Sequence, residues 1–273
     1  GATAVAVPGE IAGYSELHTK LGGKLKWKDL FEPAIGLARK GFKVGDYLDR
    51  ALQKAAATIK NNPSMKEIFW NKKDDRVFQK GDTLVQGGLA QILTDLADKG
   101  KDHFYKGALA QSIVAQLGSG GPTAQDLEQY VATWKPALKA SLGDDWSLHT
   151  TPPPGSGAIF SLALQIMMVY GVRDNKDLAF HRMVEAVKYA LAKRPELGDT
   201  QDAEKVYIII VQEMTNMKFV NEIKAKISDK GPLKDISEYG LKHSFRQDGD
   251  AVTLSLYSAE GDALVISSTI NKQ

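Results

Sequence analysis

Histidines, carboxylates and glycine-rich runs are the places where this sequence could carry out chemistry. The five histidines, at positions 18, 103, 149, 181 and 243, are scattered, and none pairs with another at the spacing of metal ligands. His181 and Glu185 stand one helical turn apart and could share a metal ion, but a third ligand is not evident. We therefore expect both side chains to pack or cap a helix start, and we expect no cofactor.

Two glycine-rich segments differ from the phosphate-binding and nucleophile motifs that they superficially suggest. Residues 118–121, Gly-Ser-Gly-Gly, follow no predicted strand and precede no Lys-Ser or Lys-Thr pair, so a loop between helices explains them. Gly155, Ser156 and Gly157 lack the Gly-x-Ser-x-Gly spacing of a nucleophile elbow. Cysteine is absent from the sequence, which excludes disulfides, thiolate metal sites and cysteine nucleophiles.

Charge and hydropathy limit the classes of partner. The chain has 35 basic and 33 acidic residues, and its net charge of +2 gives no electrostatic reason to propose nucleic acid or acidic lipid as a partner. The lysines at 24, 26 and 28 are interpreted as a solvated surface. No apolar run reaches the ~20 residues of a membrane helix, so we predict no membrane span.

The elements that would position these residues are mainly helical. Helical periodicity covers residues 27–41, 47–59, 87–99, 157–170, 181–194 and 216–228. In helix 181–194, Arg182, Glu185, Lys188 and Lys193 face away from one apolar stripe, which consists of Met183, Val184, Val187, Ala190 and Leu191. Thr123, three residues before Asp126, predicts a capping box at a further helix start. The prolines at 152–154 predict a rigid loop.

The end of the chain has a different, β-type pattern. Residues 251–259 and 263–269 are two β-type runs on either side of Glu260, Gly261 and Asp262, which predicts a hairpin. Together these signals predict an α+β fold, in which a helical body over residues 1–240 is followed by a β-hairpin over residues 250–271.

Several motifs, in one collinear order from residue 1 to residue 271, resemble the γ-glutamyltransferase (glutathione hydrolase) family. The first is Val7-Pro8-Gly9 with Gly13, which is similar to the family's Val-Pro-Gly-x-x-x-Gly segment. The others are the helix of residues 27–42, residues 104–107, residues 123–130, the proline loop at 152–157, residues 181–199, and Ser-Ser-Thr-Ile-Asn at 267–271. Common descent does not fix function, which depends on the site.

The resemblance implies a helix-rich N-terminal-nucleophile hydrolase fold of the αββα type. In that family the precursor cleaves itself before a threonine, whose hydroxyl attacks the γ-glutamyl carbonyl of glutathione with its own amine as base. When we count back without gaps from Thr269 and Asn271, the nucleophile position falls on Ala251. Val252 and Thr253 follow, where the family usually has a small residue and a histidine.

Alanine at the nucleophile position predicts no ordinary transferase activity and no catalytic residue. Ala251 has no hydroxyl, so it can form no acyl-enzyme. Thr253 is the nearby rescue candidate, because a two-residue shift keeps the same face of a strand. Thr269 and Asn271 match family residues around the nucleophile and the substrate. They are interpreted either as a substrate-binding remnant or as ordinary strand-end residues.

The resemblance also implies site parts that residues 1–273 do not match. One is an upstream arginine that grips the substrate α-carboxylate. The other is a downstream region with acidic groups, paired serines and a Gly-Gly oxyanion hole. Losing one oxyanion donor alone can cost ~10²–10³ in rate. We therefore expect a single, truncated γ-glutamyltransferase-like domain over residues 1–273, incomplete at both ends.

Three functions stay open from the sequence. The leading hypothesis is a pseudoenzyme with a binding or structural role. The second is one portion of an active glutathione hydrolase whose missing parts lie on another polypeptide, and the third is an active enzyme that uses Thr253. An isolated apolar hairpin is marginally stable and recruits a further strand, so we expect a homodimer or a second protein chain. A small-molecule ligand is left open, and the resemblance implies a secreted, extracellular protein.

Overall fold

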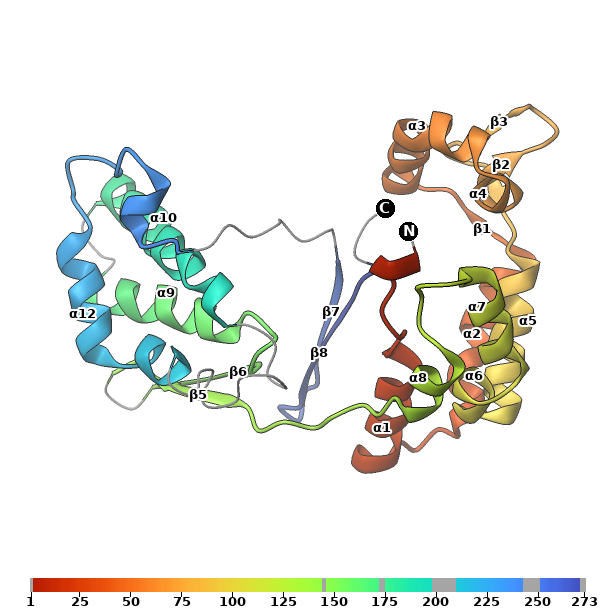
Figure 1. Ribbon diagram of the computed structural model, residues 1–273, viewed down its shortest axis with the longest axis horizontal. Coiled ribbons are helices and arrows are strands. Elements are labelled where there is room, and N and C mark those ends of the chain that lie inside the picture. Colours follow the sequence, from red (N-terminus) through yellow and green to blue (C-terminus); the bar gives the residue numbers. More distant parts are fainter. Residues whose placement is uncertain (1, 144–145, 172–174, 198–209, 243–250, 271–273) are drawn as a thin grey trace. The chain divides into compact units, whose positions relative to one another are not determined.

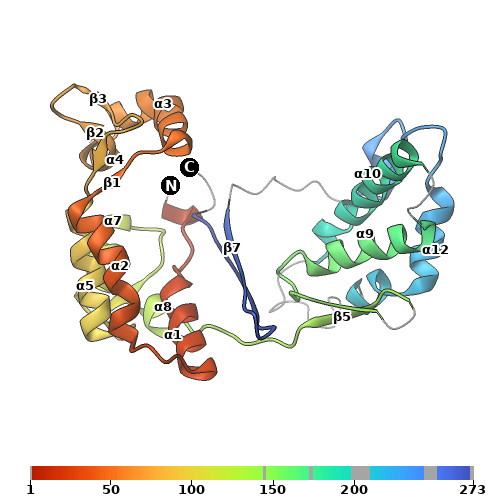
Figure 2. The same ribbon diagram turned by 180° about the vertical axis from the view of Figure 1, so that it is seen from behind.

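The described residues form two compact units. The computed structural model describes the chain except for residues 1, 144–145, 172–174, 198–209, 243–250 and 271–273. The units are Gly1–Thr133 and Trp134–Gln273 (Figures 1 and 2). Each unit has a cluster of buried apolar side chains of its own, and the prediction that residues 1–273 act as one domain stays a prediction.

The first unit is a set of helices with short antiparallel strand pairs. Its elements are η1 (Ala2–Ala4), α1 (Glu10–Leu21), α2 (Trp27–Lys40), β1 (Phe42–Lys43), α3 (Asp46–Asn61), α4 (Pro63–Phe69), β2 (Trp70–Asn71), β3 (Arg76–Val77), β4 (Thr83–Leu84), α5 (Gly87–Lys99), α6 (Asp102–Tyr105), α7 (Ala108–Leu117) and α8 (Ala124–Gln129). Strand β1 pairs with β4, and β2 pairs with β3. Helix α2 packs along α5 (Figure 2), with Ile35 and Ala38 facing inward.

Local signals fix the ends of these helices as predicted. Helix α2 ends where Gly41 takes a φ of 87°, a conformation that glycine adopts without steric cost. Helix α5 has the predicted bounds. Helix α8 begins with the predicted capping box, in which the Thr123 hydroxyl accepts from the Asp126 amide while the Asp126 carboxylate accepts from the Thr123 amide.

Two tyrosines hold the Val-Pro-Gly segment in the first unit. The Tyr105 hydroxyl donates to the Pro8 carbonyl at 2.6 Å and accepts from the Ala12 amide at 3.1 Å. The Tyr130 ring stacks on Tyr105, with centroids 5.8 Å apart. A Cβ atom on Gly9 would lie 2.1 Å from the Tyr130 hydroxyl oxygen and 2.8 Å from Cζ. The glycine of this motif is therefore explained by close packing.

We expect Gly9→Ala to lower the free energy of unfolding by about 1 kcal/mol, because the Tyr130 side chain must move away from the new methyl group. In a Tyr130→Phe background the cost should shrink, since the nearest clashing atom is gone. Urea denaturation of the two single variants and the double variant measures this coupling. Gly13→Ala is the control, because its Cβ would meet nothing within 4 Å. An equal cost of Gly9→Ala in both backgrounds would contradict the packing explanation.

The second unit is built around a buried helix. Its elements are β5 (Leu138–Ser141), β6 (Ser147–Thr150), α9 (Gly157–Tyr170), α10 (Lys176–Ala192), η2 (Arg194–Glu196), α12 (Met217–Lys226), η3 (Ile236–Tyr239), β7 (Val252–Tyr257) and β8 (Ala263–Ser268). Helix α9 packs against α10 and α12, and Ala158, Leu162 and Ile166, four residues apart, are fully buried. The Gln165 amide donates to the Ser141 carbonyl at 3.0 Å, which satisfies a polar side chain inside this core.

The predicted apolar stripe on helix 181–194 coincides only in part with the buried face of α10, because Ala190 is buried but three other members of the stripe are exposed. Met183, Val187 and Leu191 are exposed in the structure, whereas the inward positions are Glu185, Ala186, Tyr189, Ala190 and Ala192. The small residues Ala186 and Ala190 meet the core that includes α9. The helix also begins earlier than predicted, where the Asn175 side chain accepts from the amides of Asp177 and Leu178.

The fold class is α+β, as predicted. In the described part of the chain, the strands form four two-stranded antiparallel pairs beside predominantly helical structure. Within the same part, no helix combines the length and the apolar character that crossing a membrane requires.

Candidate functional site

The predicted terminal hairpin is present as β7 and β8. The two strands pair antiparallel, from Val252 opposite Ser268 to Tyr257 opposite Ala263 (Figure 1). The turn contains Gly261 with a φ of 96°, which suits glycine. The hairpin of residues 250–271 was predicted from turn residues between two β-type runs, and the structure confirms it for the residues that it describes.

The hairpin has one apolar face and one hydroxyl-rich face, because residues directly opposite each other in an antiparallel pair share a face. The mainly apolar face carries Val252, Leu254, Leu256, Leu264 and Ile266, with Ser268 at its end opposite Val252. The other face carries Thr253, Ser255 and Ser267 together with Tyr257 and Val265. On it the hydroxyl oxygens of Thr253 and Ser267 are hydrogen-bonded at 2.9 Å.

The residues singled out in the sequence gather at the hydroxyl-rich face. Ala251 directly precedes β7, and Thr269 directly follows β8. Continued by one residue, the register sets Ala251 opposite Thr269 and on the same face as Thr253. Asn271 lies outside the described residues. The structure thus brings three of the four predicted positions together, and their roles in a site stay predictions.

The predicted positions on this face carry one methyl group and two threonine hydroxyl groups. Ala251 offers a methyl group. Nucleophilic attack by a threonine requires an adjacent base, which can be its own free α-amine. The Thr253 hydroxyl is instead hydrogen-bonded to another hydroxyl, that of Ser267, and its nitrogen is a peptide nitrogen inside β7. In the uncleaved chain Thr253 therefore has no free α-amine that could act as its base.

The proline loop at residues 152–157 is rigid and closely packed. The Gly155 amide donates to the Pro152 carbonyl at 3.0 Å, and the Lys135 ammonium donates to the Pro153 carbonyl at 3.2 Å. A Cβ atom on Gly157 would lie 2.0 Å from the Thr151 carbonyl oxygen. Helix α9 begins at Gly157, so the loop and the helix start fold closely together, as the proline-rich sequence predicted.

His181 and Glu185 serve packing. The His181 Nε2 donates to the Ser228 carbonyl at 2.8 Å. The Glu185 side chain is buried, with the residue 1% exposed, and its carboxylate accepts from the Tyr239 hydroxyl at 2.8 Å and from the Lys188 ammonium at 2.8 Å. Burial raises the pKa of the Glu185 carboxyl, but the hydrogen bonds from Lys188 and Tyr239 more than offset it and leave the pKa below its usual value.

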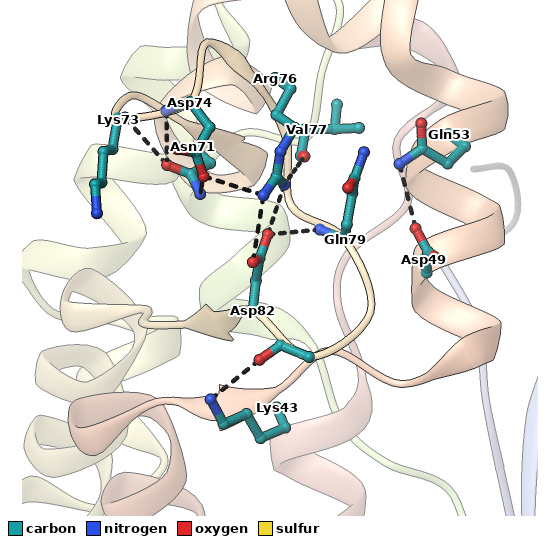
Figure 3. Close-up of polar contacts among 11 residues, drawn as sticks. Lys43, Asp49, Gln53, Asn71, Lys73, Asp74, Arg76, Val77, Gln79 and Asp82 are labelled. Atoms are coloured by element: carbon teal, nitrogen blue, oxygen red, sulfur yellow. Dashed lines mark hydrogen bonds and ion pairs between the residues drawn. The ribbon is translucent and has the colours of Figure 1, made fainter.

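A second polar cluster, which the sequence analysis did not single out, lies in the first unit (Figure 3). The Arg76 guanidinium donates to the Asp82 carboxylate at 2.6 Å, to the Asp74 carboxylate at 3.0 Å and to the Val77 carbonyl at 3.0 Å. Arg76 and the Gln79 amide lower the pKa of Asp82 to about 2. Arg76 thus links the turn between β2 and β3 to the turn between β3 and β4, which indicates a structural role.

A family model described as gamma-glutamyltranspeptidase matches residues 1–273. The chain belongs to the γ-glutamyltranspeptidase family. It is 36% identical over 280 residues to scoloptoxin SSD14 of Scolopendra dehaani, covering 99% of this chain and 48% of that protein. It is 32% identical over 275 residues to glutathione hydrolase 2 of Arabidopsis thaliana, covering 99% of this chain and 47% of that protein. The chain thus spans about half the length of the curated relatives it matches.

Solved γ-glutamyltranspeptidases have the same fold. The enzyme from Pseudomonas nitroreducens complexed with L-DON matches with a TM-score of 0.74 and 31% identity over 88% of this chain and 70% of that one. The Helicobacter pylori enzyme matches with a TM-score of 0.76 and 26% identity over 90% of this chain and 72% of that one. The α+β, N-terminal-nucleophile hydrolase fold implied by the sequence motifs is therefore confirmed for this γ-glutamyltranspeptidase relative.

Proposed function

We propose that this γ-glutamyltranspeptidase relative is a pseudoenzyme that acts by binding or as an interaction partner. One observation carries the proposal. The gap-free count from the motif at 267–271 gives Ala251 the nucleophile position, and the β7–β8 register, continued by one residue, sets Ala251 opposite Thr269. A side chain without a hydroxyl can neither cleave the preceding peptide bond nor form an acyl-enzyme. Thr253, hydrogen-bonded to Ser267 within the strand pair, is a poor substitute.

The alternative is that the chain is one portion of an active glutathione hydrolase. The observation in its favour is that the curated relatives are about twice as long as the matched chain. In that case a second polypeptide would supply the nucleophile and the remaining substrate contacts. The alternative predicts that the chain in its source is bound to a second polypeptide and is active with it. The pseudoenzyme proposal requires no such polypeptide.

The experiment is intact-mass spectrometry of the purified chain combined with hydrolysis of a γ-glutamyl anilide. We expect one uncleaved chain and no hydrolysis above buffer, with or without a dipeptide acceptor. Thr253→Ala is the matched control and should behave identically. Fragments that result from cleavage before Ala251 or Thr253 would contradict the pseudoenzyme proposal. Activity that Thr253→Ala abolishes would contradict it as well. A co-purifying polypeptide from the source that confers γ-glutamyl hydrolysis would favour the alternative.

The apolar hairpin face supports a homodimer as the partner arrangement. Val252, Leu254 and Leu256 are all more than half exposed along β7, and two symmetric copies could cover this face and the strand edge. Light scattering on a size-exclusion column should give twice the mass of one chain. A monomeric mass that persists at high concentration would contradict this arrangement.

The family resemblance supports an extracellular location. The relative from Scolopendra dehaani is named a toxin, which agrees with this proposal. Fractionation of the source that recovers the chain in the cytosol would contradict it.

A further inference from the structure

The connection between α1 and α2 has a local excess of positive charge, although the net charge of the whole chain is small. Residues 17–28 contain four lysines, one histidine and no acidic residue, although the whole chain has a net charge of +2. Two leucines stand among these lysines, in the order Lys20-Leu21-Gly-Gly-Lys24-Leu25-Lys26. Basic and large apolar residues side by side form a pattern different from the mixed charge of a solvated surface.

Both leucines are turned to solvent by a connection of fixed form. Leu21 is 68% exposed and Leu25 is 58% exposed. The chain turns at Gly22, which has a φ of 63°, and the His18 Nε2 donates to the Leu25 carbonyl at 3.0 Å. Leu21 is the last residue of α1, and this bond ties Leu25 to His18 in the last turn of the same helix, at the start of the connection that leads to α2 (Figure 1).

The far end of the connection is anchored to another helix. The Trp27 indole donates to the Leu96 carbonyl on α5 at 3.0 Å, and the ring packs edge-on against Phe31, with centroids 4.9 Å apart. Trp27 therefore contributes to packing within the unit, whereas Leu21 and Leu25 are exposed to solvent. An exposed apolar side chain on a rigid loop costs little conformational entropy when it is buried against a partner.

The lysines at the turn have charge available for a partner. Lys28 is paired with Asp98 at 2.6 Å. Lys24 and Lys26 are exposed and make no side-chain hydrogen bond or ion pair with any residue that the structure describes. The charges of Lys24 and Lys26, on either side of the exposed Leu25, are therefore available to a partner.

We propose that residues 20–26 bind the surface of an anionic phospholipid membrane. The leucines would enter the boundary between headgroups and acyl chains, and the lysines would contact the anionic headgroups, with their aliphatic stems following the leucines. The combination of lysines and exposed leucines favours lipid over nucleic acid, because contacts to phosphates need basic and polar groups and not exposed leucines. The attachment lies at the surface of the membrane and needs no spanning helix.

Another pair of exposed lysines in the same unit provides a matched control. Lys72 and Lys73 lie in the turn between β2 and β3 and are followed by Asp74 and Asp75. The same charge change can thus be made where acidic neighbours balance the lysines and no exposed leucine adjoins them.

The experiment is flotation of the full chain with phosphatidylcholine vesicles that contain about a quarter phosphatidylserine, against pure phosphatidylcholine vesicles, at low and high salt. Each lysine near such a surface is worth about fivefold in the binding constant. Lys24→Glu with Lys26→Glu should therefore weaken binding at least about 25-fold. Leu21→Ser with Leu25→Ser should weaken it about tenfold, and Lys72→Glu with Lys73→Glu should leave it unchanged.

Thermal melts followed by circular dichroism test whether the variants are folded. Substitutions at such exposed positions should leave the melting temperature unchanged. Absence of binding to the phosphatidylserine vesicles, or an equal loss in the Lys72–Lys73 variant, would overturn the proposal. Wild-type binding by the leucine variant would overturn it as well, since pure charge attraction would then suffice. Binding to an acidic protein or to heparin without binding to the vesicles would assign the surface to a different partner and also refute it.

Discussion

Gly157→Ala is expected to lower the free energy of unfolding by about 3 kcal/mol, the upper end of the range for overpacking. The new methyl group would lie 2.0 Å from the Thr151 carbonyl oxygen and 2.8 Å from two atoms of the Thr150 side chain. The closest atom belongs to the backbone, so no side-chain rotation relieves the clash. The neighbouring prolines at 152–154 restrict the backbone that would have to move. Either α9 shifts from its buried position or the proline loop is displaced.

Gly36→Ala is the matched control for this prediction. Gly36 lies inside α2, and its Cβ would meet nothing within 4 Å, so alanine there should stabilise the protein by about 0.5–1 kcal/mol. Opposite signs of the two glycine substitutions in urea denaturation would separate close packing from a general preference of helices for alanine. A stabilising or neutral Gly157→Ala would mean that the close approach at the start of α9 is not required for folding.

The sequence predicted the elements of this fold well wherever local signals decide them. Helices α5 and α9 have the predicted bounds, because amphipathic or buried runs end at Gly100 and Gly171, both of which take positive φ. The hairpin followed from a Glu-Gly-Asp turn between β-type runs. Each of these signals acts over a few residues, so it can be interpreted without knowledge of the tertiary partners.

The buried face of α10 could not be predicted in this way. Periodicity placed Glu185 away from the packed stripe, yet the structure buries it, because its partner Tyr239 comes from η3, far along the chain. An acidic side chain can be buried where a specific hydrogen-bond donor pairs with it. The donor here is Tyr239, which cannot be identified from residues 181–194 alone. The Arg76 cluster was also not predicted, although its partners Asp74 and Asp82 are only two and six residues away, because the pairing depends on how the turn folds.

The pairing within the hairpin was predictable for a different reason. A β-hairpin has a fixed register once its turn is placed, so a motif at one strand end determines which residue stands opposite. The pairing, continued by one residue, sets Ala251 opposite Thr269, whereas the assignment of Ala251 to the nucleophile position rests on the family resemblance and stays a prediction. What binds at this face depends on groups beyond the hairpin, and a two-stranded element does not specify them.

Substitution of the buried Glu185 is expected to have the second large effect on the free energy of unfolding. Glu185→Gln keeps the shape of the side chain but removes the charge that the Tyr239 hydroxyl and the Lys188 ammonium stabilise. Hydrogen bonds to a buried charged group are worth about 1.5–3 kcal/mol, and the partial exposure of Lys188 reduces its share. We expect about 2 kcal/mol lower stability near neutral pH. Glu222→Gln on α12, an exposed position, is the matched control and should change stability little.

The dependence of this effect on pH distinguishes a charged Glu185 from a merely well-packed one. The pKa of Glu185 in the folded protein lies below the usual 4.5, so ionised Glu185 favours the folded state. Its stabilising contribution is present above the unfolded-state pKa and is lost as the pH falls through the folded-state pKa. The difference between wild type and Glu185→Gln in urea denaturation should therefore be largest at neutral pH and should shrink below about pH 4.5. A difference that stays constant from pH 7 to pH 3 would show that the carboxylate charge does not stabilise the contact between α10 and η3.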